Sequence, residues 1–140
     1  MPLGGRLRRM VHVPGRLYSV NHLTTASLPR LFARNERVIS VFDTEVGTMA
    51  VILVGATMVG SMDTVWAGTV TPAHRRAIVW DQVPPVPVVL ERGAEMGRFN
   101  MGSSVILLFA RDRVQWSDGL HPGLAVRMGE RIGSASTLTT

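Results

Sequence analysis

The sequence predicts a mainly β domain, barrel-like or sandwich-like, made of short strands with one or two short helices. Short apolar runs, some alternating with polar residues, recur along the whole chain, and 14 glycines and 8 prolines supply turns between them. Only one segment has a clear helix start. Several short strands at regular spacing are typical of sandwiches and barrels, and 140 residues make one domain or part of one.

Eight runs are expected as strands because they are apolar or alternate with a period of two. Their ranges are 10–13, 38–42, 49–54, 64–70, 86–90, 105–109, 114–116 and 124–128. The run 49–54 is rich in β-branched residues, which predicts a buried strand. The run 114–116 is expected to pair back on 105–109.

The one clear helix is expected over 27–33. Ser27 is a suitable N-cap, Pro29 suits the first turn, and Asn35 suits the end of the helix.

The longest uncharged stretch, 46–62, is 17 residues long and contains three glycines. A membrane-spanning helix needs about 20 strongly apolar residues, so we expect two buried strands around Gly55 instead. Gly55 and Gly60 have the outer spacing of a phosphate-binding P-loop, but the lysine of that motif is absent. Residues 1–9 lack the apolar region of a signal peptide, which makes the cytoplasm the expected compartment.

The composition excludes several kinds of chemistry. There is no cysteine, which excludes disulfides, thiolate metal sites and a cysteine nucleophile. All fifteen basic residues are arginines, so a lysine Schiff base and lysine-attached cofactors are excluded as well. The net charge is +5, and arginine pairs occur at 8–9 and 75–76. Few aromatics and no recognition motif accompany these pairs, so an anionic membrane surface is a better partner than nucleic acid.

The four histidines, His12, His22, His74 and His121, do not lie at the short spacings of a metal clamp, so no metal site is predicted. His22, in the run SVNH, is the best of them for a site role. The alternative is a turn histidine that is hydrogen-bonded to backbone.

Gly102 and Ser103 stand in a turn before an apolar strand, which is an ordinary place for both residue types. The same pair has a chemical interpretation. Without a side chain on Gly102, its carbonyl is open to attack by Ser103 Oγ, and a strained peptide there favours an N-to-O acyl shift.

The chain resembles the C-terminal part of bacterial phosphatidylserine decarboxylases from residue 1 to about residue 133. The segments that carry the resemblance are VPGRLYSVNH (13–22), LFARNERV (31–38), FDT (42–44), ILVGAT (52–57), VGS (59–61), VWAG (65–68), GAEMGRF (93–99) and MGSS (101–104). The Gly-Ser-Thr motif of the family appears here as Gly102-Ser103-Ser104, which keeps a hydroxyl at the third position.

The resemblance implies that a proenzyme cleaves itself between Gly102 and Ser103 into a β-chain part, 1–102, and an α chain, 103–140. Ser103 becomes a covalent pyruvoyl cofactor, which forms a Schiff base with phosphatidylserine and serves as the electron sink for its decarboxylation to phosphatidylethanolamine. The implied location is the cytoplasmic face of the bacterial membrane, where the protein is peripheral. His22 is the residue we expect to contact substrate.

The family also has an N-terminal region whose Asp and His act with the processing serine. Neither matches a residue of this sequence, so we expect this chain alone to be inactive. The competing interpretation is a non-catalytic β-barrel module that binds a partner or a membrane surface, with Ser103 only a turn residue.

Overall fold

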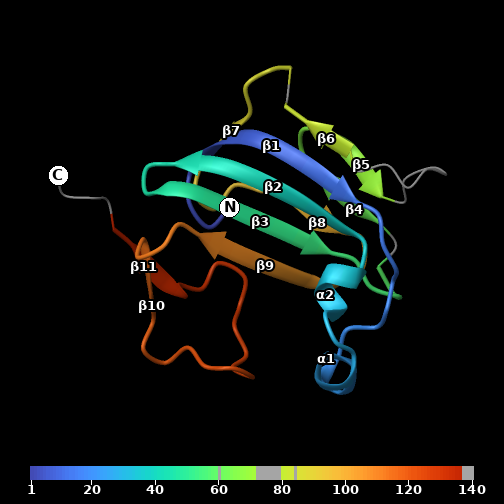
Figure 1. The fold of residues 1–140 in the computed structure, drawn as a ribbon. Helices are drawn as coiled ribbons and strands as arrows, with labels where there is room; N and C mark the ends of the chain where they lie inside the picture. Colours follow the sequence, from blue (N-terminus) through green and yellow to red (C-terminus); the bar gives the residue numbers. More distant parts are fainter. Residues whose placement is uncertain (60, 72–79, 84, 137–140) are drawn as a thin grey trace.

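The computed structural model describes residues 1–59, 61–71, 80–83 and 85–136 (Figure 1). These residues form a mainly β structure with two short helices, which confirms the predicted fold class. The elements in chain order are β1 (Gly5–Val13), α1 (His22–Ser27), α2 (Leu31–Arg34), β2 (Arg37–Thr44), β3 (Gly47–Val54), β4 (Met62–Thr64), β5 (Gly68–Thr71), β6 (Trp80–Gln82), β7 (Val89–Leu90), β8 (Gly97–Phe99), β9 (Ser104–Phe109), β10 (Val114–Trp116) and β11 (Gly133–Ala135).

The larger sheet has the strand order β6-β1-β2-β3-β9, and β7 also pairs with β1. All of these pairings are antiparallel. The strands curve together into half of a barrel (Figure 1). The runs expected over 38–42, 49–54 and 105–109 lie within β2, β3 and β9, so these three predictions are confirmed.

One face of the larger sheet forms the core. Side chains alternate between the faces of a strand, so Val38, Phe42, Met49 and Val51 share this inner face, and each is at most 2% exposed. A smaller sheet of order β5-β4-β8 packs against it. Met62 of the smaller sheet belongs to the same buried cluster as Val38.

The run 64–70 is a hairpin and not the single strand that its apolar residues predict. β4 ends before Trp66 and β5 begins after it, at Gly68. The φ of Gly68 is 64°, a left-handed conformation that glycine adopts without strain. Trp66 packs edge-on against Phe42, with 6.0 Å between ring centroids, and its Nε1 donates to Met10 Sδ at 3.2 Å. The glycine turn and this aromatic contact decide the local structure.

The helix expected over 27–33 is wrong in its position. α1 ends at Ser27, and α2 follows only after a break. The physical reason is that Asn21 provides a complete capping box further upstream and starts α1 there. Pro29 disfavours helical backbone at the residue before it, and Leu28 is accordingly extended, which ends α1.

Two predictions near the end of the chain are also wrong. β10 pairs with β11 and not with β9. Residues 124–128 form no strand, although the run is apolar except for Arg127 and contains no glycine. The side chains of Leu124, Val126 and Met128 are 43%, 52% and 103% exposed, so no described strand or core covers them. An apolar run becomes a strand only with a partner strand, and the described residues provide none here.

The long uncharged run is divided as expected. β3 ends at Val54 and β4 begins at Met62, so strand segments stand on both sides of Gly55. Of the run expected over 86–90, β7 keeps only the last two residues. Within the described residues, neither helix is long and apolar enough to cross a membrane.

Candidate functional site

Gly102 and Ser103 lie in the connector that carries the chain from the smaller sheet to the larger one. The connector consists of residues 100–103, because β8 ends at Phe99 and β9 begins at Ser104. β8 pairs with β4, whereas β9 pairs with β3. Strand pairing therefore fixes the connector on both sides.

The hydroxyl of Ser103 donates a hydrogen bond to the backbone carbonyl of Val54, the last residue of β3. Ser103 is half-buried and Val54 is fully buried. The N–H of Gly55 donates to the carbonyl of Glu36 at 2.8 Å, which ties the end of β3 to the start of β2. A neutral carbonyl is not a general base at neutral pH, so this contact positions the hydroxyl without activating it.

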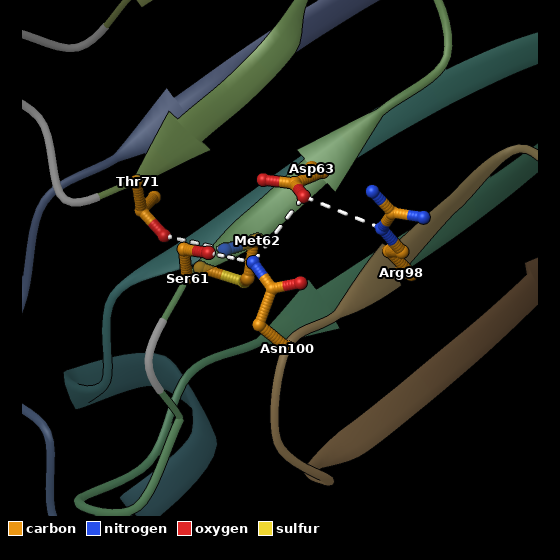
Figure 2. Close-up of polar contacts among 6 residues, drawn as sticks. All are labelled: Ser61, Met62, Asp63, Thr71, Arg98 and Asn100. Carbon is orange, nitrogen blue, oxygen red and sulfur yellow. Dashed lines mark hydrogen bonds and ion pairs between the residues drawn. The ribbon is translucent and has the colours of Figure 1, made fainter.

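Asn100 anchors the other end of the connector (Figure 2). Its backbone N–H donates to the carbonyl of Ser61 at 3.1 Å, and its side-chain Nδ2 donates to Ser61 Oγ and to Asp63 Oδ2, the latter at 3.3 Å. Arg98 donates from Nε to the same oxygen of Asp63 at 3.5 Å. We call Ser61, Asp63, Arg98 and Asn100 the Asp63 cluster.

The carboxylate of Asp63 is a charged acceptor at neutral pH. A hydrogen bond from Thr69 is the main reason that the pKa of Asp63 lies below its ordinary value of 3.8. Burial acts in the opposite direction, and hydrogen bonds from Asn100 and Arg98 add to the lowering of this pKa. Hydrogen bonds to a charged acceptor are stronger than those between neutral groups, so the cluster is a suitable anchor for Asn100.

Gly102 is the open part of the connector. It is exposed, and no described atom lies within 4 Å of the position that a Cβ would take, apart from its chain neighbours. The peptide between Gly102 and Ser103 is therefore accessible. Positive φ angles occur at other glycines of the described chain but not at Gly102, so the connector does not use the unusual backbone angle that glycine permits.

Within the described part of the chain, no histidine or carboxylate is hydrogen-bonded to Ser103. His12 is buried, and its Nε2 lies 2.8 Å from Glu36 Oε1. His22 is the first residue of α1 and is exposed, and the described residues show no hydrogen bond between it and Ser103. His74 lies outside the described residues. The described residues thus supply no general base to the candidate serine, and the expected substrate contact of His22 stays a prediction.

Comparison with known proteins shows the family. The family model for phosphatidylserine decarboxylase matches residues 1–134. The chain belongs to the phosphatidylserine decarboxylase family. The family model spans the connector, the Asp63 cluster and the segment around His22, so the resemblance found in the sequence motifs is confirmed.

Among the similar proteins are three that are named phosphatidylserine decarboxylase proenzyme. The identity is 59% over 138 residues in Azotobacter vinelandii, 55% over 135 residues in Pseudomonas fluorescens and 55% over 138 residues in Stutzerimonas stutzeri. These matches cover 97%, 95% and 97% of this chain, but 48%, 47% and 46% of the relatives. The chain therefore spans about half the length of the curated relatives it matches.

Asn35 is expected from the sequence only as the end of a helix. It does follow α2, but its side chain is fully buried. The side chain accepts from the N–H of Tyr18 at 3.0 Å and donates to the carbonyls of Tyr18 and Gly55, both at 2.9 Å. It thereby ties the segment before His22 to the residue that follows Val54. The burial of an amide has no local sequence signal.

Gly55 allows this close approach. A Cβ at this position would lie 3.1 Å from Leu17 Cδ2 and 3.2 Å from the carbonyl oxygen of Glu36. Packing thus explains why residue 55, the first position of the P-loop-like spacing, is a glycine. Gly60, the second glycine of that spacing, lies outside the described residues. Among the residues that the structure describes, no three His, Asp or Glu side chains gather into a metal site.

Proposed function

We propose that this chain carries the self-processing serine of a phosphatidylserine decarboxylase. Ser103 Oγ attacks the carbonyl carbon of Gly102, and the peptide C–N bond breaks, which leaves an ester and a free amine on residue 103. Loss of the Cα proton of residue 103 then breaks the Cβ–Oγ bond, and Gly102 leaves as a carboxylate. Water converts the remaining dehydroalanine into a pyruvoyl group and releases ammonia. The products are residues 1–102 and 103–140.

The observation that supports this reaction best is the exposed Gly102–Ser103 peptide between two anchored ends. The hydrogen bond to Val54 holds the nucleophilic oxygen, and the Asp63 cluster holds the residue two positions before the carbonyl that is attacked. Fixing both groups in one short connector reduces the orientational freedom that they must lose to react. The open space at Gly102 leaves the carbonyl accessible.

The residues also fit a pyruvoyl group at position 103. Ser103 provides its carbon atoms, and the departure of Gly102 would leave it at the open side of the connector. When present, this group supplies a carbonyl that accepts electrons while phosphatidylserine loses carbon dioxide to give phosphatidylethanolamine. β9 would hold the group in place through its pairing with β3.

The general base for processing is proposed to come from the part of the family protein that this chain lacks. The described residues place no base on Ser103, whereas general-base catalysis contributes about 100- to 10,000-fold. The same observation favours a second interpretation of the isolated chain, a non-catalytic β module. Decarboxylation is accordingly assigned to the full-length protein, meaning this chain joined to the half that its relatives have in addition.

We further propose that the full-length protein is peripheral at an anionic membrane surface, on the cytoplasmic face, since its proposed substrate is a phospholipid. Arg6, Arg8 and Arg9 on β1 and Arg16 beyond it are all exposed. Arg8 forms an ion pair with Asp43 at 3.4 Å. The net charge of +5 supports attraction to anionic lipids. The pair at 75–76 lies outside the described residues.

A matched pair of serine variants tests the processing proposal in the full-length protein. Ser103→Ala removes Oγ, so we expect neither chain cleavage nor decarboxylation. Ser104→Ala changes the neighbouring residue, whose hydroxyl is not part of the reaction, and we expect two pieces with the smaller one reactive to hydrazides. Cleavage of Ser103→Ala at the usual position would overturn the assignment.

A further inference from the structure

The face of the larger sheet that points away from the core is apolar as well. Strand pairing places Val11 opposite Ile39, Ile39 opposite Ile52, and Ile52 opposite Ile106, so four β-branched side chains form one row across four strands. The next row adds further apolar side chains on β2, β3 and β9. We define the outer face by Val11, Ile39, Val41, Ala50, Ile52, Ile106 and Leu108.

The side chains of the outer face are less buried than those of the inner face. Val38, Val51 and the other inner-face residues of β2 and β3 are almost completely buried. The outer-face residues are only half-buried, and Leu108 is 53% exposed. An antiparallel sheet with one side in water normally alternates apolar with polar residues. Apolar residues on both faces indicate a sheet that is covered on both sides.

The described chain covers only the inner face. Figure 1 views the larger sheet from the outer face, and no described helix or strand crosses it. The smaller sheet lies behind, and α1 and α2 lie beside the end of the sheet. Both buried clusters of the described residues contain inner-face side chains and none of the outer face.

We infer that the outer face binds the polypeptide that makes up the other half of the full-length family proteins. The relatives have 52% or more of their length outside the matched region, since the matches cover 46–48% of them. A contiguous apolar surface marks an interaction site, and this one is uncharged at its centre, where Ile39 and Ile52 lie. Four strands are about 14 Å wide, which is enough for one amphipathic helix of about 10 Å diameter.

Charged side chains border the outer face. Charged side chains on this face occur at its margins among the described strands, as Arg6, Arg9, Arg37 and Asp43, and Arg8 of the β1 bulge forms an ion pair with Asp43. A membrane-binding face would combine its apolar centre with a rim of basic residues. The arginines here lie on β1 and at the start of β2, and Asp43 offsets part of their charge, so binding of anionic vesicles through this face is an alternative that the experiment must test. This inference does not depend on self-cleavage.

Co-expression tests the inference directly. The binding partner is the part of the Azotobacter vinelandii relative that lies outside the matched 138 residues. Every version of our chain carries Ser103→Ala, so the outcome is independent of processing. We expect this partner to be captured by the otherwise unchanged chain and by Thr48→Glu, which changes an exposed residue near the start of β3, at the charged margin of the outer face opposite Asp43. We expect Ile52→Glu to reduce capture about ten-fold or more, because an unpaired carboxylate would be buried.

A second measurement covers the case in which Ile52→Glu fails to fold. Hydroxyl-radical labelling of Ile39, Ile52 and Ile106 in the unchanged chain is expected to fall when the partner is bound, while labelling of the exposed Met58 stays the same. The inference would be overturned if the unchanged chain did not capture the partner, or if both glutamate variants captured it equally. It would also be overturned if the labelling of Ile39, Ile52 and Ile106 did not change. The inference would also be overturned if the chain formed a dimer that Ile52→Glu disrupts. Binding to phosphatidylglycerol vesicles that is lost in Ile52→Glu would overturn it as well.

Discussion

The hydroxyl of Ser103 is hydrogen-bonded to the backbone carbonyl of Val54 at the end of the neighbouring strand. This contact spans 49 residues of sequence and exists only because β9 pairs with β3. It fixes the candidate nucleophile beside the peptide bond that it would attack. It also occupies the hydroxyl proton, so Ser103 must exchange this partner for a base before it reacts.

The two processed pieces should stay together after cleavage. β3 belongs to residues 1–102 and β9 to residues 103–140, and Met49 to Val54 pair with Phe109 to Ser104 across the cut. We expect the pieces to elute as one species from a gel-filtration column in native buffer and to separate in denaturant. Separation in native buffer would show that this pairing does not hold them.

Asn100→Ala in the full-length protein should slow self-cleavage about ten-fold, because the connector loses its anchor on Asp63 and small displacements of reacting groups are costly. Glu95→Ala, at an exposed position before β8, is the control. Hydroxylamine cleaves the ester intermediate. If Asn100 positions the groups for ester formation, cleavage in the presence of hydroxylamine should also be about ten-fold slower in Asn100→Ala. Normal cleavage of Asn100→Ala would contradict this role.

The Asp63 cluster should make stability depend on pH in acid. The pKa of Asp63 is lower in the folded chain than its ordinary value of 3.8, so its stabilising effect is complete well above pH 3.8. The effect disappears as the pH falls through the folded-state pKa. We expect the difference in unfolding free energy between the unchanged chain and Asp63→Asn to shrink toward zero over this range in denaturant titrations. A difference that stays constant down to pH 2 would refute it.

Lipid binding should be weak and sensitive to salt. The exposed arginines Arg6, Arg8, Arg9 and Arg16 attract anionic headgroups, and salt screens such contacts. Flotation with phosphatidylglycerol vesicles should therefore show binding at low salt that is lost at high salt, and little binding to phosphatidylcholine. Equal binding to both kinds of vesicle would argue against an electrostatic surface.

The sequence predicted those parts of the fold that depend on local pattern. The runs in β2, β3 and β9 alternate or are apolar throughout, and the structure confirms them. The sequence-based prediction was wrong where two local signals compete. The capping box at Asn21 starts α1 upstream of the helix start predicted at Ser27. The strand expected over 114–116 is present as β10, but its predicted pairing with β9 is wrong, because neither strand alone specifies its partner.

The candidate site was only partly predictable for the same reason. Gly102 and Ser103 were found from their residue types and from the family resemblance. The contact between Asn100 and Asp63 joins residues 37 apart, and the carbonyl of Val54 belongs to the backbone, so neither leaves a signal in the sequence. Their positions follow from how β4, β8, β3 and β9 pair.

The most direct test is a mass spectrum of the denatured protein. The purified 140-residue chain is incubated alone, and again with the half of the family protein that it lacks supplied as a separate polypeptide. We predict an intact chain in the first sample, because Ser103 has no described base, and pieces corresponding to residues 1–102 and 103–140 in the second. Rapid and complete cleavage of the chain alone would place the base within these residues. An intact chain in both samples would contradict cleavage between Gly102 and Ser103.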